Sequence, residues 1–396
     1  MSAAHPLVNA HVHVPPNFSA FADADDLVES AVRERVRVVG ASNFHDHRVY
    51  RRFADAAVAA GVVPLFGLEF ITVVEPLRAS GVRVNDPANP GRMYLCGKGV
   101  DPFREPAPAA AAIDATARAA NRARATRMAD LLCRCFAEAG VALDLDAASI
   151  SGDVAARAGV PADWVVLQER HLAMAFQGAL FRVCPPAARD TLLQRVYGRP
   201  PTAACDDPVA VQSEIRARLL KVGGPAFVDE TPLSFADAVE LILSWGGIPC
   251  YPTLADGATP VCPFEDGPDE LVARLDELGI HAAELIPVRN APDIVLAYAR
   301  AFRSAGMVVT AGTEHNTPDR IPLAPTARGG ALIPDEALEL FYEGACVVAG
   351  HQAERAAGRP GFVDARGKPG SGDREARIRR YAAIGEAVIE RGCVPA

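Results

Sequence analysis

Apolar residues in the first seventy positions follow two alternating patterns. Short runs of β-branched and other apolar residues cover 7–14, 36–42 and 62–70, and stretches with apolar residues three or four apart lie at 24–34 and 48–60. The short runs are typical of strands buried on both faces, and the longer stretches are typical of helices that cover a sheet. This βαβαβ alternation predicts a parallel sheet.

The pattern changes after residue 76. A Gly-, Pro- and Asn-rich segment at 85–91 predicts a loop, and 93–99 predicts a short strand. An Ala- and Arg-rich run at 107–139 then has apolar residues at helical spacing, and similar patterns recur at 150–158, 163–182, 186–196 and 208–221. We interpret residues 77–228 as an α-rich insertion or cap.

The βα alternation returns after the insertion. It predicts helices up to 245 and at 268–278 and 292–305, with strands at 247–251, 281–287 and 307–312. Together with the first seventy residues this makes six or seven parallel βα units, enough to close a barrel. The predicted fold is therefore an α/β barrel of parallel strands in two parts, 1–76 and 229–350, with the insertion between them and a helical C-terminal tail at 351–396.

Composition excludes several classes of partner. Of 396 residues, 40 are Lys or Arg and 49 are Asp or Glu, so the net charge of −9 argues against binding to nucleic acid. The chain shows neither a secretory signal nor an apolar run of about 18 residues, so we expect a cytoplasmic protein with no membrane partner. Nine scattered cysteines lack a Cys-x-x-Cys pair, which favours reduced thiols, and we assign them no role.

Histidines and carboxylates follow nearly every predicted barrel strand. His11 and His13 are two residues apart, so a strand presents both side chains on the same face. Functional side chains of a βα barrel lie at the carboxyl ends of its strands. Imidazole and carboxylate ligands together suit Zn, Mn or Fe. We therefore predict a site for one to three divalent ions, and the candidate ligands at the other strand ends are His45, Glu69, Glu314 and His315; Glu284 also stands at a strand end.

Three of these segments resemble the motifs of one family, the PHP superfamily, named for polymerase and histidinol phosphatase. His11-Val12-His13 is similar to its first motif, Gly67-Leu68-Glu69 to its third, and Ala311-Gly312-Thr313-Glu314-His315 to its last. The resemblance implies a distorted seven-stranded βα barrel, a trinuclear Zn, Mn or Fe site in which Glu69 bridges metals, and hydrolysis of phosphate esters.

The second motif departs from that family pattern. The family has Asp-His where this chain has Asn43-Phe44, so one or two ligands are missing. We assign His45 as the replacement ligand because it lies closer to the strand end than the alternative, His47.

Two later positions also depart from the pattern. Tyr251 stands where the family often has a histidine, Glu314 replaces an aspartate, and His315 comes one residue early. These departures favour a mononuclear or dinuclear site over the full trinuclear one.

Further candidates lie outside the strand-end motifs. His171 follows Glu169 and Arg170 in the insertion, and because the family supplies a histidine from that part of the chain, we predict that it reaches the metals or the substrate; the alternative is that it belongs to the polar face of a helix. Either His45 or His171 is the expected general acid or base beside a metal-bound water. Cations and an amide near strand ends are expected to bind an anionic substrate, namely Lys98, Arg289, Asn290 and Arg320.

These observations favour a metal-dependent hydrolase that cleaves a phosphate ester of a small molecule with a metal-activated water. Its predicted metal ligands are His11, His13, His45, Glu69, His171, Glu314 and His315. Two alternatives remain open: a metal-dependent lyase, isomerase or hydrolase with the same barrel that acts on an unphosphorylated sugar or acid, and a degenerate barrel that binds without catalysis. The sequence leaves the oligomeric state open.

Overall fold

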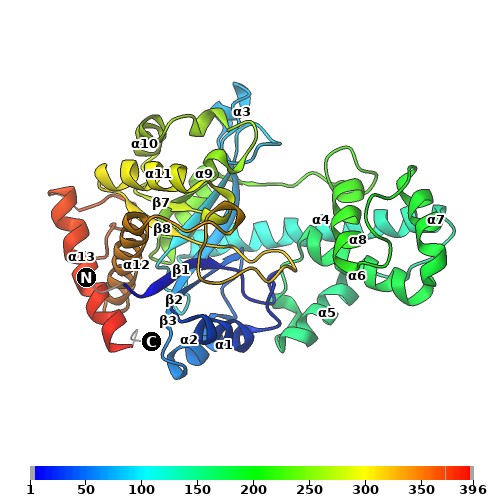
Figure 1. The fold of residues 1–396 in the computed structure, drawn as a ribbon, viewed down its shortest axis with the longest axis horizontal. Coiled ribbons are helices and arrows are strands. Elements are labelled where there is room, and N and C mark those ends of the chain that lie inside the picture. The colour runs from blue at the N-terminus through cyan, green and yellow to red at the C-terminus, as the bar shows by residue number, and fades with distance from the viewer. Residues whose placement is uncertain (1–4, 371, 393–396) are drawn as a thin grey trace. The chain divides into compact units, whose positions relative to one another are not determined.

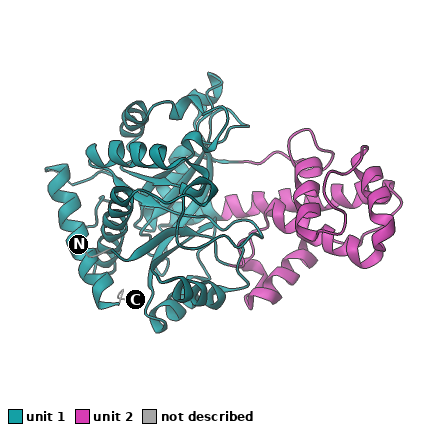
Figure 2. Ribbon diagram, in the orientation of Figure 1, with its two compact units in different colours: residues 1–14, 19–114, 232–396 teal, residues 15–18, 115–231 magenta. Residues whose placement is uncertain are grey.

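Strands from the first hundred residues and from residues 233–311 join in one sheet (Figure 1). The structure is a computed structural model, and it describes residues 5–370 and 372–392. The chain forms two compact units (Figure 2). Unit 1 comprises residues 1–14, 19–114 and 232–396, and unit 2 comprises residues 15–18 and 115–231. The divisions expected at 76, 228 and 350 stay predictions.

Unit 1 contains a nearly closed, barrel-like sheet. Its strands follow the order β1-β2-β3-β4-β6-β7-β8, and β5 pairs with β3 outside this path. Most strands are buried along their whole length, because helices cover the sheet and parallel strands are rich in apolar residues. The strands are β1 (Leu7–Val12), β2 (Val36–Phe44), β3 (Val63–Val73), β4 (Arg92–Lys98), β5 (Leu233–Ser234), β6 (Ile248–Thr253), β7 (Ala282–Leu285) and β8 (Val308–Ala311).

One strand of the barrel runs against the others. β4 pairs antiparallel with both β3 and β6, whereas the other strand pairs are parallel. Between β3 and β4 the chain has only the five-residue helix α3 (Glu75–Ala79) and a Gly- and Pro-rich loop. Without a longer helix to form a crossover, the chain turns back along β3. The expected α/β barrel is therefore confirmed as a largely parallel sheet, but the expectation that every strand is parallel was wrong at β4.

Side-chain caps mark the start of some helices of unit 1. In α1, for example, the Asp23 side chain accepts a hydrogen bond from the backbone N–H of Asp26, and the helix ends at Arg35 in the left-handed region. Its residues Leu27, Val28 and Ala31 are buried. The longer helices are α1 (Ala24–Glu34), α2 (Tyr50–Ala59), α9 (Phe235–Ser244), α10 (Pro268–Glu277), α11 (Pro292–Ser304), α12 (Asp335–Ala356) and α13 (Arg374–Arg391).

β1 and β8, the first and last strands of the sheet order, approach each other just beyond the end of β8. Val12 and Glu314 form a parallel bridge, and the backbone N–H of Glu314 donates to the carbonyl of His11 at 2.9 Å. Gly312 makes this approach possible, because a Cβ at that position would lie 2.2 Å from the Cβ of His11. The barrel therefore closes at the histidine pair of β1.

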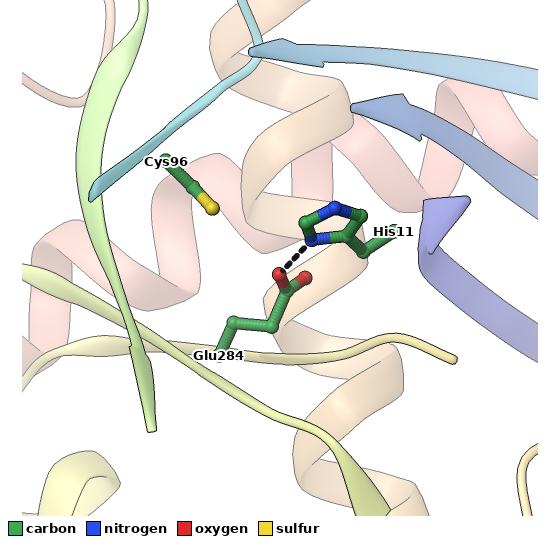
Figure 3. Close-up of side chains that lie close together, drawn as sticks. All are labelled: His11, Cys96 and Glu284. Atoms are coloured by element: carbon green, nitrogen blue, oxygen red, sulfur yellow. Dashed lines mark hydrogen bonds and ion pairs between the residues drawn. The ribbon is translucent and has the colours of Figure 1, made fainter. Parts of the chain in front are cut away.

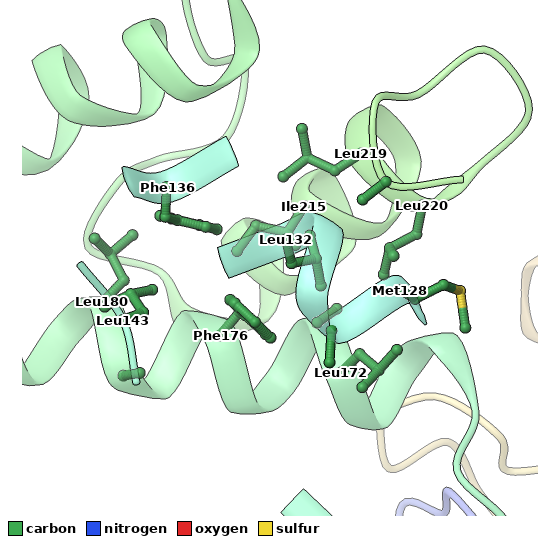
Figure 4. Packing of buried hydrophobic residues seen from close by; sticks show 14 of the residues in the cluster. Met128, Leu132, Phe136, Leu143, Leu172, Phe176, Leu180, Ile215, Leu219 and Leu220 are labelled. Carbon is green, nitrogen blue, oxygen red and sulfur yellow. The ribbon is translucent and has the colours of Figure 1, made fainter. Parts of the chain in front are cut away.

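Unit 2 is a group of helices around an apolar core (Figure 4). The helix α4 (Pro108–Glu138) begins in unit 1 and continues through unit 2. The other elements are α5 (Ala147–Ala158), α6 (Glu169–Val183), α7 (Pro186–Tyr197), α8 (Pro208–Ile215) and a π-helical turn at Arg216–Leu220. Phe136 of α4 packs on Phe176 of α6, with ring centroids 5.7 Å apart. Among the described helices of both units, none combines the length and apolarity needed to cross a bilayer.

Candidate metal centre

The paired histidines lie at the end of β1: His11 belongs to the strand and His13 follows it. His11 and His13 are each 1% exposed, and their rings stack with centroids 5.4 Å apart. Glu69 of β3 lies beside them, with its Oε2 atom 3.5 Å from Nε2 of His13. One ligand atom from each of these three residues lies within 4.8 Å of the other two. The fold thus brings together three of the residues that the sequence predicts as metal ligands.

Glu284 of β7 fixes the orientation of His11. Its Oε1 atom lies 2.6 Å from Nδ1 of His11, and the carboxylate is completely buried (Figure 3). An ionised carboxylate can only accept, so Nδ1 carries the proton and Nε2 holds a lone pair. Within the described residues, that Nε2 atom is buried without a hydrogen-bond partner. A carboxylate behind an imidazole whose other nitrogen is open is the usual setting of a metal-ligating histidine.

Lys98 of β4 is the second partner of Glu284. Its Nζ atom donates to Oε2 of Glu284 at 2.5 Å and to the carbonyl of Ala10 at 3.0 Å, and the lysine side chain is 3% exposed. Burial by itself would raise the pKa of Glu284, but the Lys98 ammonium and His11 outweigh it and lower that pKa to about 2. The same ion pair raises the pKa of Lys98 against the effect of burial. Both groups are therefore charged at neutral pH.

Cys96 is the neighbour that sequence reasoning missed. Its sulfur forms a second compact group with His11 and Glu284 (Figure 3). Burial raises the pKa of the Cys96 thiol well above its usual range, so it stays protonated and is a weak ligand. A single cysteine among nine carries no signal in the sequence, because only the antiparallel direction of β4 places it here. Glu284 did stand at a predicted strand end, although we did not include it among the ligands.

Glu69 is a buried carboxylate with an unusual acidity. Burial raises the pKa of Glu69 to about 7, and the Glu314 and Glu284 carboxylates add to this effect against His11 and Lys98. A bound divalent cation would lower the pKa of Glu69, because it favours the ionised form of its ligands.

The backbone that follows β8 is strained. Glu314 and His315 have φ angles of 63° and 49°, which place two successive non-glycine residues in the left-handed region. Such conformations concentrate at functional sites because the surrounding structure must enforce them. The Glu314 carboxylate pairs with the Arg289 guanidinium and accepts from Nδ2 of Asn316 at 3.1 Å. Although burial opposes it, Arg289, followed by His11 and His13, lowers the pKa of Glu314.

His315 lies outside both compact groups. Its Nδ1 is 2.7 Å from the Thr313 hydroxyl, and its Nε2 is 2.8 Å from the carbonyl of Ile321. Its ring stacks on Phe21. Both ring nitrogens are thus engaged with protein groups, and the metal-binding role expected for His315 stays a prediction.

The divergent second motif supports the strand ends. The side chain of Asn43 accepts from the backbone N–H of Val14 at 2.7 Å and donates to the Val14 carbonyl at 2.9 Å, so it joins β2 to the end of β1. His45 has a φ of 53° and packs edge-on against Phe44 and Phe70. It belongs to neither compact group. Its assignment as a replacement ligand, or as a general acid or base, stays a prediction.

His171 belongs to unit 2. Its Nδ1 atom accepts from the backbone N–H of Gln168 at 3.1 Å, and its ring meets the edge of Phe18. Burial, with Arg157 acting in the same direction, lowers the pKa of His171 to about 3, so its imidazole is neutral. The expectation that it reaches the metals or the substrate stays a prediction, as does its role as acid or base.

The residues expected to bind substrate already have partners within the protein. Lys98 pairs with Glu284, Arg289 with Glu314, and Arg320 with Asp26. The amide of Asn290 donates to the Leu254 carbonyl at 2.6 Å and to Oδ1 of Asp256 at 2.9 Å. Arg289 and Arg320 remain 40% and 52% exposed, so their guanidiniums are accessible to a ligand. The substrate-binding roles of all four residues stay predictions.

Tyr251 explains one departure from the family pattern. Its hydroxyl is 2.9 Å from Oε1 of Glu265, which also accepts the backbone N–H of Leu254. Tyr251 therefore anchors the loop after β6.

The residues present fit a divalent metal ion. The open Nε2 of His11, the imidazole of His13 and the carboxylate of Glu69 are two nitrogen donors and one oxygen donor. This donor set suits Zn, Mn or Fe, and three protein ligands leave a position for water or substrate.

Together the fold and this cluster define a mixed α/β barrel with a buried His and Glu centre, and two solved structures share the fold. An amidohydrolase from Chromobacterium violaceum, solved with bound sulfate and no metal, is 17% identical over 84% of this chain and 95% of its own, with a TM-score of 0.53. A Bifidobacterium adolescentis protein proposed to be a metal-dependent phosphoesterase is 16% identical over 86% and 98%, with a TM-score of 0.55. Neither a family model nor a curated protein matches the sequence.

Proposed function

We propose that this protein is a metal-dependent hydrolase that cleaves a phosphate ester of a small molecule. The observation that carries the proposal is the open Nε2 of His11, buried beside His13 and Glu69 and oriented by Glu284. The metal-dependent phosphoesterase proposed for the Bifidobacterium relative and the likeness of three strand-end segments to PHP motifs support the same reading.

His11, His13 and Glu69 would hold the ion, with the neighbouring Glu314 as a further candidate ligand. When bound there, a divalent ion supplies Lewis acidity that lowers the pKa of water and neutralises negative charge on a phosphoryl group.

The chain's own residues would orient the reactants. Glu284 holds His11 in the tautomer whose Nε2 faces the centre. Glu314 holds the Arg289 guanidinium, which is accessible enough to donate two hydrogen bonds to a phosphate. The burial of His11, His13 and Glu69 keeps bulk water away from the polar contacts and so strengthens them.

A second candidate function follows from the other structural relative. The Chromobacterium protein is an amidohydrolase, and Asn43 supports β1 in this chain where the PHP pattern has a metal ligand. The same barrel would then act on an unphosphorylated compound, by hydrolysis of an amide or as a lyase or isomerase. A barrel that only binds ligands is the third candidate.

Metal removal tests the proposal. The purified protein is stripped with EDTA, the chelator is removed, and phosphate release from a panel of small phosphate monoesters is followed before and after addition of Mn²⁺ or Zn²⁺. We expect the rate of phosphate release to fall at least about 100-fold when the metal is removed and to recover when it is added back. Without the ion, nothing at the site would activate water or neutralise the negative charge of the phosphoryl group. Turnover of amides or sugars without phosphate release would favour the second candidate. Metal-independent phosphate release would contradict the proposal.

A further inference from the structure

Two groups of candidate ligands meet at His11, and they differ in their charge balance. In the first, Glu69 lies 3.5 Å from the imidazole of His13, and no lysine or arginine of the described chain forms an ion pair with this carboxylate. The second, with Cys96 and Glu284, includes a carboxylate that already pairs with the Lys98 ammonium at 2.5 Å. A pair of groups around a shared histidine would ordinarily suggest two metal positions.

The oxygens of Glu284 are fully engaged without a metal. Oε1 lies 2.6 Å from Nδ1 of His11, and Oε2 accepts from Nζ of Lys98 and from the hydroxyl of Thr310, at 2.5 Å and 3.3 Å. Lys98 is in turn held by the carbonyl of Ala10. An ion that approached Glu284 would therefore meet a buried ammonium at contact distance, and the two cations would repel each other strongly in this low-dielectric interior.

The choice of lysine at this position is itself informative. Lys98, Lys221 and Lys368 are the lysines of a chain that otherwise uses arginine for its cations. Lys368 is exposed and the Lys221 side chain is 46% exposed, whereas that of Lys98 is 3% exposed. An ammonium is a compact point charge, comparable in this respect to a metal ion, while a guanidinium is a broad planar fork.

We propose that the Lys98 ammonium serves as the fixed second cation of this centre, so that the chain binds one divalent ion at His11, His13 and Glu69 and none at Glu284. This inference rests on the proposed metal-dependent function. It assigns Glu284 to the support of His11 and gives Lys98 a positioning role, in place of direct contact with the substrate.

Metal counting on the whole chain tests this assignment. The wild type, Lys98→Met, the double variant Lys98→Met/Glu284→Gln and the control Lys368→Met are each dialysed to equilibrium against Mn²⁺, which prefers oxygen and nitrogen ligands to thiols. Bound Mn²⁺ per chain and its electron paramagnetic resonance spectrum are then measured. We expect one ion in the wild type and in Lys368→Met, and two ions with an exchange-coupled spectrum in Lys98→Met. The double variant should return to one ion, because it removes the unbalanced carboxylate as well.

Each outcome has a defined meaning. Two ions in the wild type, or a single ion in a folded Lys98→Met, would overturn the assignment of Lys98 and leave the metal-dependent hydrolase intact. Absence of bound metal from the wild type would overturn both proposals. If Lys98→Met does not fold, as judged by circular dichroism, Glu284→Gln decides: we expect one ion bound about 10- to 100-fold more weakly, because Glu284 supports a ligand without being one. Complete loss of the ion at saturating Mn²⁺ would refute the assignment.

Discussion

Two glutamates, the partly buried Glu169 of unit 2 and the buried Glu69 of unit 1, have opposite electrostatic settings. Glu169 of unit 2 has three cations on its carboxylate: Arg124 at 2.9 Å, Arg216 at 3.2 Å and Lys221 at 2.7 Å. Although burial opposes them, these cations lower the pKa of Glu169. Glu69 of unit 1 has the imidazole of His13 as an ion-pair partner at 3.5 Å, and burial raises its pKa to about 7.

The difference separates a structural carboxylate from a candidate ligand. The charge of Glu169 is balanced by the chain itself, so folding alone explains its position. Among the described residues, no lysine or arginine forms an ion pair with Glu69, so a cation that binds from solution would stabilise its ionised form. The same criterion separates Glu69 from Glu284, which Lys98 neutralises.

The largest expected effect comes from removal of the histidine pair. His11→Asn with His13→Asn removes both nitrogen donors, so we expect bound metal to fall from one ion per chain to none and turnover to fall at least about 1,000-fold. Metal analysis and steady-state kinetics on the same samples measure the two effects. The control is His281→Asn, whose side chain is 16% exposed and lies next to Asp276 away from the centre. Retention of one metal ion per chain in the double variant would contradict the assignment of His11, His13 and Glu69 as the metal site.

Neutralising Glu169 should destabilise the protein, whereas neutralising Glu69 should not. In metal-free protein at pH 8, Glu169→Gln leaves three cations close together without their anion, and we expect a loss of about 3 kcal/mol in the free energy of unfolding. Glu69→Gln replaces a poorly balanced buried charge with a neutral group of the same shape, so it should leave stability unchanged or raise it. Urea unfolding at that pH measures both. A loss for Glu69→Gln as large as that for Glu169→Gln would show that Glu69 is structural too.

The smallest effect concerns His351, a buried histidine whose partners are entirely within the protein. Its Nε2 donates to the Gly246 carbonyl at 2.6 Å, and its Nδ1 accepts from the backbone N–H of Phe362 at 2.8 Å, so the ring must be neutral. Burial lowers the pKa of His351 to about 4. Protonation therefore favours the unfolded chain, and the contribution to stability is present above about pH 6.5 and lost as the pH falls toward 4.

The matched variant is His351→Gln, which keeps one donor and one acceptor. We expect the wild type to lose about 2 kcal/mol more than this variant between pH 7 and pH 5, from the difference between the folded and unfolded pKa values. Urea unfolding at both pH values measures the loss. Equal losses in the two proteins would show that His351 does not titrate as its contacts indicate.

Much of the barrel was predictable because its signals are local. The alternation of strands and helices follows from runs of apolar residues, so the predicted strands at 36–42, 281–287 and 307–312 match β2, β7 and β8 closely. The direction of β4 was not predictable in this way, because a strand's apolar pattern does not record which way its neighbours run. The same distinction between local and long-range features applies to the residues of the candidate metal centre.

The sequence alone predicts that His11 and His13 point the same way at the first strand and that Glu69 and Glu314 lie in or just after other strands, because these placements are properties of nearby residues. Which of these groups meet, and which are already neutralised, depends on how distant segments pack in the folded barrel. The ion pair of Lys98 with Glu284 joins residues 186 positions apart through an antiparallel strand. Electrostatic balance in a buried site depends on distances of a few ångströms between distant segments, and these distances exist only once the barrel has closed.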